Sequence, residues 1–233
     1  MARPGPGSDS NQESSLASRR SFLRTTAVAA PAAAATLAAA GLTPAAQGAG
    51  TSGYPSLFPG QNARNFAEIR NDENAHVAYL RNALGSNSFA QPQFQNLVIP
   101  SNNVNLFVAT SAIFENTGVG AYLAGGSFLT QPTLVKAASI LTVEANHAGY
   151  LNTLINFPIV LNAETLALPF SLMGVLVNIK HYIVDLTFAE SLLAAVGTTP
   201  SQANDVAILR FALLLEYLEA AYYNTNVQTF FGV

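Results

Sequence analysis

The sequence lacks cysteine and tryptophan, and it carries little charge. Only 10% of its 233 residues are charged, whereas about 25% of the residues of an ordinary soluble domain are charged. Half of the residues are hydrophobic. The absence of cysteine excludes disulfides, thiolate nucleophiles and cysteine-ligated zinc or iron–sulfur centres. A formal net charge of −3 offers no basic surface for phosphates, so we expect no nucleic-acid partner. The high apolar content excludes a disordered chain.

Residues 1–50 have the pattern of an export signal. Arg19 and Arg20 precede a Phe-Leu pair, and no charged residue occurs between Arg24 and position 50, where alanine dominates. This arrangement resembles the twin-arginine signal peptide, which directs folded proteins to a dedicated translocon. We therefore expect contact with the twin-arginine translocon during export, cleavage of the leader, and a periplasmic, extracellular or cell-surface location.

The alternative for this leader is an uncleaved membrane anchor. Alanine is a poor membrane residue, and Pro31 and Pro44 interrupt the run, so cleavage is favoured. The longest later apolar stretch, residues 165–179, contains Pro169 and falls short of the roughly 20 residues that a spanning helix needs. We expect no stable membrane span after cleavage.

The remaining chain, residues 51–233, predicts an all-α fold in one bundle. Apolar residues recur at helical spacing, glycine or proline marks the ends of the helical stretches, and no segment alternates like a half-buried strand. Residues 85–103 form an extended connection, and residues 156–204 form a crossover with one or two further helices. The four long helices are expected at about 62–84, 104–123, 132–155 and 205–224.

Acidic and histidine side chains interrupt the apolar faces of these helices. Glu73 and His76 lie on the same face as Phe66, Ile69 and Leu80. The third helix repeats this frame with Glu144 and His147, so that both helices read Glu-x-x-His-x-x-Tyr-Leu. A core position occupied by Glu or His in place of Leu or Ile indicates a chemical role or a buried partner.

The second and fourth helices share a different frame. Glu115 is followed seven residues later by Tyr122, and Glu216 is followed seven residues later by Tyr223. The chain therefore contains two copies of one unit, an ExxHxxY helix followed by an ExxxxxxY helix. Tyr122 and Tyr223 are candidates for hydrogen bonds to the glutamates.

Four glutamates and two histidines converging in one bundle indicate a metal site. Bare buried carboxylates cost several kcal/mol each, and Glu and His three residues apart share one helix face. Two such helices, with one Glu from each of two others, form the ligand set of di-iron and di-manganese bundles. We expect two divalent ions, iron or manganese, with zinc a further candidate. The predicted ligands are Glu73, His76, Glu115, Glu144, His147 and Glu216.

Three points stay open in this assignment. Glu219, three residues after Glu216, is an additional ligand or the true one in place of Glu216. The alternative to a metal site is a set of core residues that satisfy one another. His181 lacks the Glu-x-x-His frame and is expected on the surface or between helices.

Several segments resemble the ferritin-like domain family, which includes desiccation-related and twin-arginine-exported proteins. The resemblance rests on residues 73–80, 114–122, 144–148 and 211–223. It implies a ferritin-like four-helix bundle with long crossovers, and it maps the family's di-metal ligands onto the six residues named above.

The order of the helices departs from that family. The helix resembling residues 205–224 usually comes first, whereas here it comes last, which gives the order B-C-D-A. One explanation is a circular permutation within the chain. The others are that this helix begins a second, truncated domain or completes a neighbouring subunit. Because residues 156–204 are long enough to cross a bundle of about 30 Å, intramolecular permutation is favoured.

Two functions are compatible with these features. The first is an exported di-metal protein, an oxidoreductase that oxidises Fe²⁺ or reduces O₂ or peroxide in stress protection. The second is a non-catalytic stress, desiccation or structural protein whose site is empty or purely structural. The scarcity of charge also favours a homo-oligomer.

Overall fold

The computed structural model describes residues 60–233, which form a bundle of α-helices. No β-strand occurs between residues 60 and 233, where the one β-bridge joins Phe94 and Ile183. The all-α prediction is therefore confirmed. The predicted signal peptide, residues 1–50, lies outside the described residues. The helices are α3 (Gln61–Leu84), α4 (Val104–Gly126), α5 (Gln131–Leu154), α6 (Leu172–Ile179), α7 (Leu186–Ala194) and α8 (Gln202–Phe231), with short 3₁₀ turns at Gly85–Asn87, Leu161–Ala163 and Lys180–Tyr182.

The helix ends follow from local chemistry. The side chain of Asn103 accepts a hydrogen bond from the Leu106 amide at the start of α4, and Ser201 does the same for Asn204 at the start of α8. Pro132 lies in the first turn of α5. Helix α8 extends beyond the predicted 205–224 at both ends, because the Ser201 cap starts it earlier and it continues to Gly232, whose φ is 69°.

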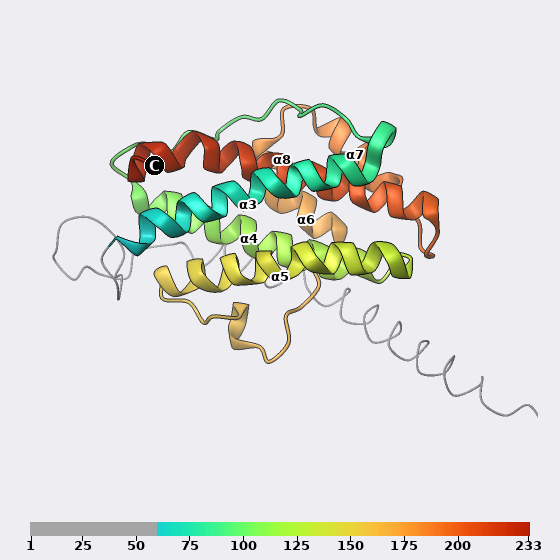
Figure 1. Ribbon diagram of the computed structural model, residues 1–233, viewed down its shortest axis with the longest axis horizontal. Coiled ribbons are helices and arrows are strands. Elements are labelled where there is room, and N and C mark those ends of the chain that lie inside the picture. Colours follow the sequence, from blue (N-terminus) through green and yellow to red (C-terminus); the bar gives the residue numbers. More distant parts are fainter. Residues whose placement is uncertain (1–59) are drawn as a thin grey trace, which may run out of the picture.

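Two helix pairs make up the bundle. Helix α3 packs along α8, and α4 packs along α5 (Figure 1). Because α8 packs on α3 of the same chain, it completes the bundle without a second copy. The naming of the four helices as B-C-D-A stays a prediction.

Two long connections cross the bundle. Residues 88–103 run along α8, where the Asn226 amide accepts a hydrogen bond from Ile99 N (3.0 Å) and donates one to Leu97 O (2.8 Å). The second connection, between α5 and α8, holds two helices, of which α6 packs on α4 and α7 on α8. No helix within residues 60–233 is both long and apolar enough to cross a membrane.

Apolar side chains fill the bundle on both sides of its middle. One cluster includes Phe66, Phe107 and Tyr222, and the other includes Leu80 and Leu213. On α3 these clusters lie before and after the Glu-x-x-His segment. Glu73 and His76 are therefore held between two apolar layers.

Candidate metal centre

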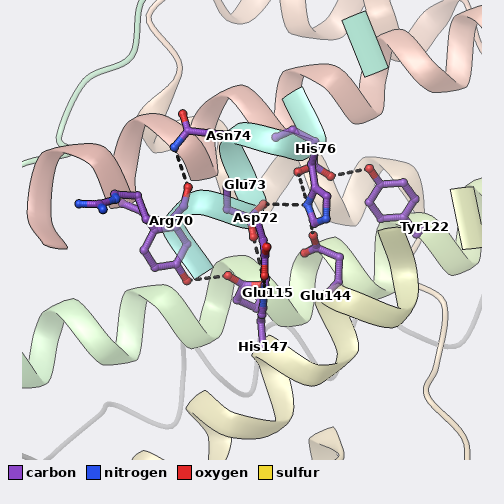
Figure 2. A network of polar contacts seen from close by, with 11 residues as sticks. Arg70, Asp72, Glu73, Asn74, His76, Glu115, Tyr122, Glu144 and His147 are labelled. Atoms are coloured by element: carbon purple, nitrogen blue, oxygen red, sulfur yellow. Dashed lines mark hydrogen bonds and ion pairs between the residues drawn. The ribbon is translucent and has the colours of Figure 1, made fainter. Parts of the chain in front are cut away.

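Each of the four long helices places a glutamate in the centre of the bundle. The side chains of Glu73, Glu115, Glu144 and Glu216 belong to fully buried residues. His76 and His147 are also buried, at 8% and 7% exposed. Figure 2 shows the labelled members on α3, α4 and α5 turned toward one another. The structure thus brings together all six residues that the sequence singled out.

These six residues form two overlapping groups. The His76 group consists of Glu73, His76, Glu144 and Glu216, and the His147 group consists of Glu73, Glu115, Glu144 and His147. Within each group, one potential ligand atom per residue lies within 4.8 Å of every other. Glu73 and Glu144 belong to both groups, so their carboxylates lie between the two positions.

Both imidazoles direct Nδ1 at the carboxylates. His76 Nδ1 lies 3.1 Å from Glu144 Oε1 and 3.2 Å from both Glu73 Oε2 and Glu216 Oε2. His147 Nδ1 lies 3.1 Å from Glu73 Oε1 and 3.2 Å from Glu115 Oε2. One nitrogen of each ring is therefore surrounded by oxygen atoms from different helices.

Two tyrosines hold the outer oxygens of two glutamates. Tyr223 on α8 donates a hydrogen bond to Glu115 Oε1 on α4, at 2.6 Å. Tyr122 on α4 donates to Glu216 Oε1 on α8. Each tyrosine thus bonds the glutamate of the opposite helix, and the pair follows the two-fold repeat of the sequence.

Asp72 belongs to the site, although the sequence analysis did not single it out. Its Oδ2 lies 3.2 Å from His147 Nε2, the ring nitrogen that faces away from Glu73 and Glu115. The feature of the sequence that could have indicated Asp72 is its position directly before the predicted ligand Glu73. The matching position in the second copy, before Glu144, is Val143, so the repeat did not point to it.

Glu219 and His181 have different surroundings. Glu219 is buried at 4% exposed, and its Oε2 has no hydrogen-bond partner. It lies near the centre but in neither ligand group, so its role as a ligand stays a prediction. His181 lies in the exposed 3₁₀ turn, and its backbone carbonyl accepts a hydrogen bond from Asn96.

The excess of carboxylates controls the proton affinity of the site. Burial, with the charge of Glu115, raises the pKa of Glu73 to about 7, against the hydrogen bonds from the two histidines. Burial and neighbouring carboxylates hold the pKa values of Glu144 and Glu219 well above the usual range. Burial alone lowers the pKa of His147, but Glu115 and Glu73 outweigh it and raise the pKa to about 12.

A family model of the ferritin-like domain matches residues 25–156. The chain belongs to the ferritin-like domain family. The matched range contains α3, α4 and α5, while α8, with Glu216 and Glu219, lies beyond it. No curated protein and no solved structure matches the chain.

The donor set of this ferritin-like protein fits divalent cations. Among the described residues, five buried carboxylate oxygens accept no hydrogen bond from a hydroxyl or amide, and four of them belong to glutamates of the two groups. Three of these four face a histidine Nδ1 at 3.1–3.2 Å, whereas Glu144 Oε2 has no polar partner. An unpartnered buried carboxylate oxygen is costly unless a cation binds it. Mixed carboxylate and imidazole donors suit iron, manganese and zinc.

Proposed function

We propose that this protein is an exported di-metal carboxylate protein that binds two iron or manganese ions. The observation that carries the proposal is the set of buried oxygens on Glu73, Glu144 and Glu216 that no hydroxyl or amide satisfies and that converge on two histidine Nδ1 atoms. One ion would be held by the His76 group and the other by the His147 group, with Glu73 and Glu144 contributing to both.

Charge balance supports two cations. Glu73, Glu115, Glu144, Glu216 and Glu219 are all buried in or beside the centre. Without metal, two imidazolium ions can balance only two of these carboxylates, and the raised pKa values of Glu73, Glu144 and Glu219 indicate that the others retain protons. Two divalent ions would balance four ionised carboxylates and leave both imidazoles neutral as ligands.

The chain itself supplies orientation and exclusion of water. Iron or manganese held there would supply the redox chemistry for oxidising Fe²⁺ or reducing O₂ or peroxide. The phenols of Tyr122 and Tyr223 fix the direction of Glu216 and Glu115. The two apolar clusters keep bulk water from the carboxylates, which strengthens their attraction for cations.

We further propose that the protein works outside the cytoplasm in stress protection. The twin-arginine-like leader supports this, because that route exports folded proteins and allows the site to be filled beforehand. The second candidate is a non-catalytic stress, desiccation or structural bundle, in which the histidine–glutamate ion pairs at 3.1–3.2 Å stabilise the fold without metal.

Metal analysis of the full chain tests the proposal. After native export and gentle purification, we expect two iron or manganese ions per chain by mass spectrometry of the digested protein. The double variant His76→Ala/His147→Ala should lose at least one of them, whereas Glu190→Ala, on the exposed surface of α7, should keep both. Absence of bound metal, with no uptake of added Fe²⁺ or Mn²⁺, would exclude a di-metal protein. Metal binding without Fe²⁺ oxidation or peroxide consumption would favour the second candidate.

A further inference from the structure

The two ligand groups are related by the internal repeat. Helix α3 corresponds to α5, with Glu73 matching Glu144 and His76 matching His147, and α4 corresponds to α8, with Glu115 matching Glu216. The crossed tyrosine–glutamate bonds obey the same relation. Each group has three glutamates and one histidine, two of the glutamates being shared. If nothing else differed, the two metal positions would be equivalent.

The first departure from this symmetry concerns a partner for the histidine Nε2 atom, the ring nitrogen opposite the proposed ligand atom Nδ1. Asp72 Oδ2 lies 3.2 Å from His147 Nε2, so a carboxylate from α3 can accept the proton of that nitrogen (Figure 2). The matching residue for His76 is Val143, which has no polar side-chain atom. A carboxylate behind a ligating imidazole fixes its tautomer and makes its other nitrogen a stronger donor. His147 has this support, and His76 has no equivalent from Val143.

The second departure involves Gly118 on α4 and Glu219 on α8, which occupy matching positions in the two copies. A Cβ atom at Gly118 would lie 2.5 Å from Glu144 Oε2 and 3.6 Å from Glu219 Oε1. The missing side chain therefore leaves room for both carboxylates against α4. Glu144 Oε2 and Glu219 Oε2 have no hydrogen-bond partner.

Glu219 lies close to Glu144, the glutamate that both groups share, against the same point of α4. Its buried carboxylate therefore adds negative potential to the centre and does not by itself distinguish the two positions.

Resting on the proposed di-metal function, we infer that the two metal positions are unequal and that the His147 position binds the first ion. Asp72 strengthens its imidazole donor. The His76 position has the same basic ligand set without a carboxylate from Val143 behind its histidine, so it takes the second ion with lower affinity.

Titration of the metal-free full chain with Mn²⁺ tests the order. Isothermal calorimetry, with electron paramagnetic resonance to count free Mn²⁺, should resolve two events of one ion each, separated by about tenfold or more in affinity. Asp72→Ala should weaken the first event about 10–100-fold and leave the second nearly unchanged. Glu219→Gln should weaken both events alike, because Glu219 lies close to Glu144, which both groups share.

Two equal positions that share Glu73 and Glu144 could also fill in two steps, so single histidine variants are needed. His147→Ala should remove the tighter event and leave a weak one, and His76→Ala should retain the tighter event. Val143→Asp is the matching gain-of-function variant, because it places a carboxylate behind His76. The Mn²⁺ affinities of the two positions should then become more similar. Circular dichroism checks the helical content of each variant.

The outcomes separate the inference from the proposed function. If both histidine variants leave the same affinity, the positions are equivalent. If Val143→Asp does not narrow the gap, a carboxylate behind the histidine is not its cause. Either result makes the inference wrong while two ions still bind. If the unmodified chain binds no Mn²⁺ or Fe²⁺, the proposed function itself fails. A variant of Asp72 that does not fold leaves the Val143→Asp comparison as the deciding measurement.

Discussion

Tyr223 donates a hydrogen bond of 2.6 Å to Glu115 Oε1, across the bundle from α8 to α4. The phenol occupies one carboxylate oxygen, while the other, Oε2, faces His147 Nδ1 at 3.2 Å. Tyr122 and Glu216 repeat this arrangement in the opposite direction. The tyrosines therefore set which oxygen of each glutamate is turned toward the candidate metal centre.

Tyr223→Phe removes this hydrogen bond with almost no change in shape. We expect a 10–100-fold loss of affinity for one Mn²⁺ ion, because the Glu115 carboxylate is no longer held in position. Calorimetric titration measures the effect. The control is the neighbouring Tyr222→Phe, whose hydroxyl donates to the Phe107 carbonyl at 2.9 Å. It should cost about 1 kcal/mol of stability and leave the affinity for metal unchanged; equal affinities in the two variants would contradict the assigned role of Tyr223.

Glu144→Gln should stabilise the metal-free protein while weakening metal binding. Glu144 Oε1 faces His76 Nδ1 at 3.1 Å, but Oε2 has no hydrogen-bond partner. Burial and the charges of Glu73, Glu216 and Glu115 disfavour the ionised carboxylate. The neutral amide removes the cost of protonating this carboxylate, or of burying its charge, when the chain folds. A gain of about 1 kcal/mol would raise Tm by about 2–4 °C at this chain length. Thermal unfolding with and without Mn²⁺ measures both effects, with Glu190→Gln on the surface as the control. A lower Tm in the metal-free variant would show that the Glu144 carboxyl group stabilises the fold there.

The metal-free protein should become less stable as the pH rises. Burial raises the pKa of Glu73 from 4.5 to about 7, so the folded chain retains a proton that the unfolded chain loses. Burial lowers the pKa of His147, but the surrounding carboxylates outweigh it and raise the pKa from 6.5 to about 12. The folded chain therefore also retains the His147 proton at a pH where the unfolded chain has lost it. Because the folded state binds more protons, the free energy of unfolding decreases as the pH rises. Glu73 causes this decrease between about pH 4.5 and 7, and His147 causes it above pH 6.5.

Thermal unfolding of the metal-free chain between pH 5 and pH 8 checks this dependence. We expect Tm to decrease steadily across that range. Saturating Mn²⁺ should reverse the trend, because ligand binding displaces protons and strengthens as pH rises. A Tm that rises with pH in the absence of metal would contradict the excess of buried carboxylate.

Asp205→Ala should lower stability without affecting the metal centre. The Asp205 carboxylate on α8 accepts hydrogen bonds from Thr130 N (2.8 Å) and from Thr133 Oγ1 (2.7 Å) at the start of α5. Loss of these bonds should cost about 2 kcal/mol, measured by urea denaturation. Asp185→Ala, which removes only the exposed cap of the short helix α7, should cost about 1 kcal/mol or less. Both variants should bind two metal ions.

The pH dependence of the Asp205 contribution has the opposite sign. Burial by itself raises the pKa of the Asp205 carboxyl, but hydrogen bonds from Thr130 and Thr133 outweigh burial and lower it below its ordinary value of 3.8. The ionised Asp205 carboxylate therefore stabilises the fold above about pH 3.8, and this stabilisation is lost as the pH falls through the lower pKa of the folded state. The difference in stability between Asp205→Ala and the unmodified chain should accordingly shrink below pH 3.8.

Sequence alone determined the helices and the identity of six side chains in the centre. Periodicity predicts α3, α4 and α5 to within a few residues, because apolar spacing and residues such as Gly85 and Pro132 act locally. The Glu-x-x-His spacing places Glu73 beside His76 for the same reason: residues three apart on a helix share a face. The repeat then indicates that Glu144 and His147 form an equivalent pair.

Only the tertiary structure decided which of these side chains meet across helices. The packing of α3 against α8 and of α4 against α5 directs each tyrosine to the glutamate of the opposite helix, and it brings Asp72 to His147, 75 positions away in the chain. It also places Glu219 beside Gly118 and outside both ligand groups. Such contacts depend on how helices rotate and pack together, and helical periodicity defines one face of each helix but not the residue it meets.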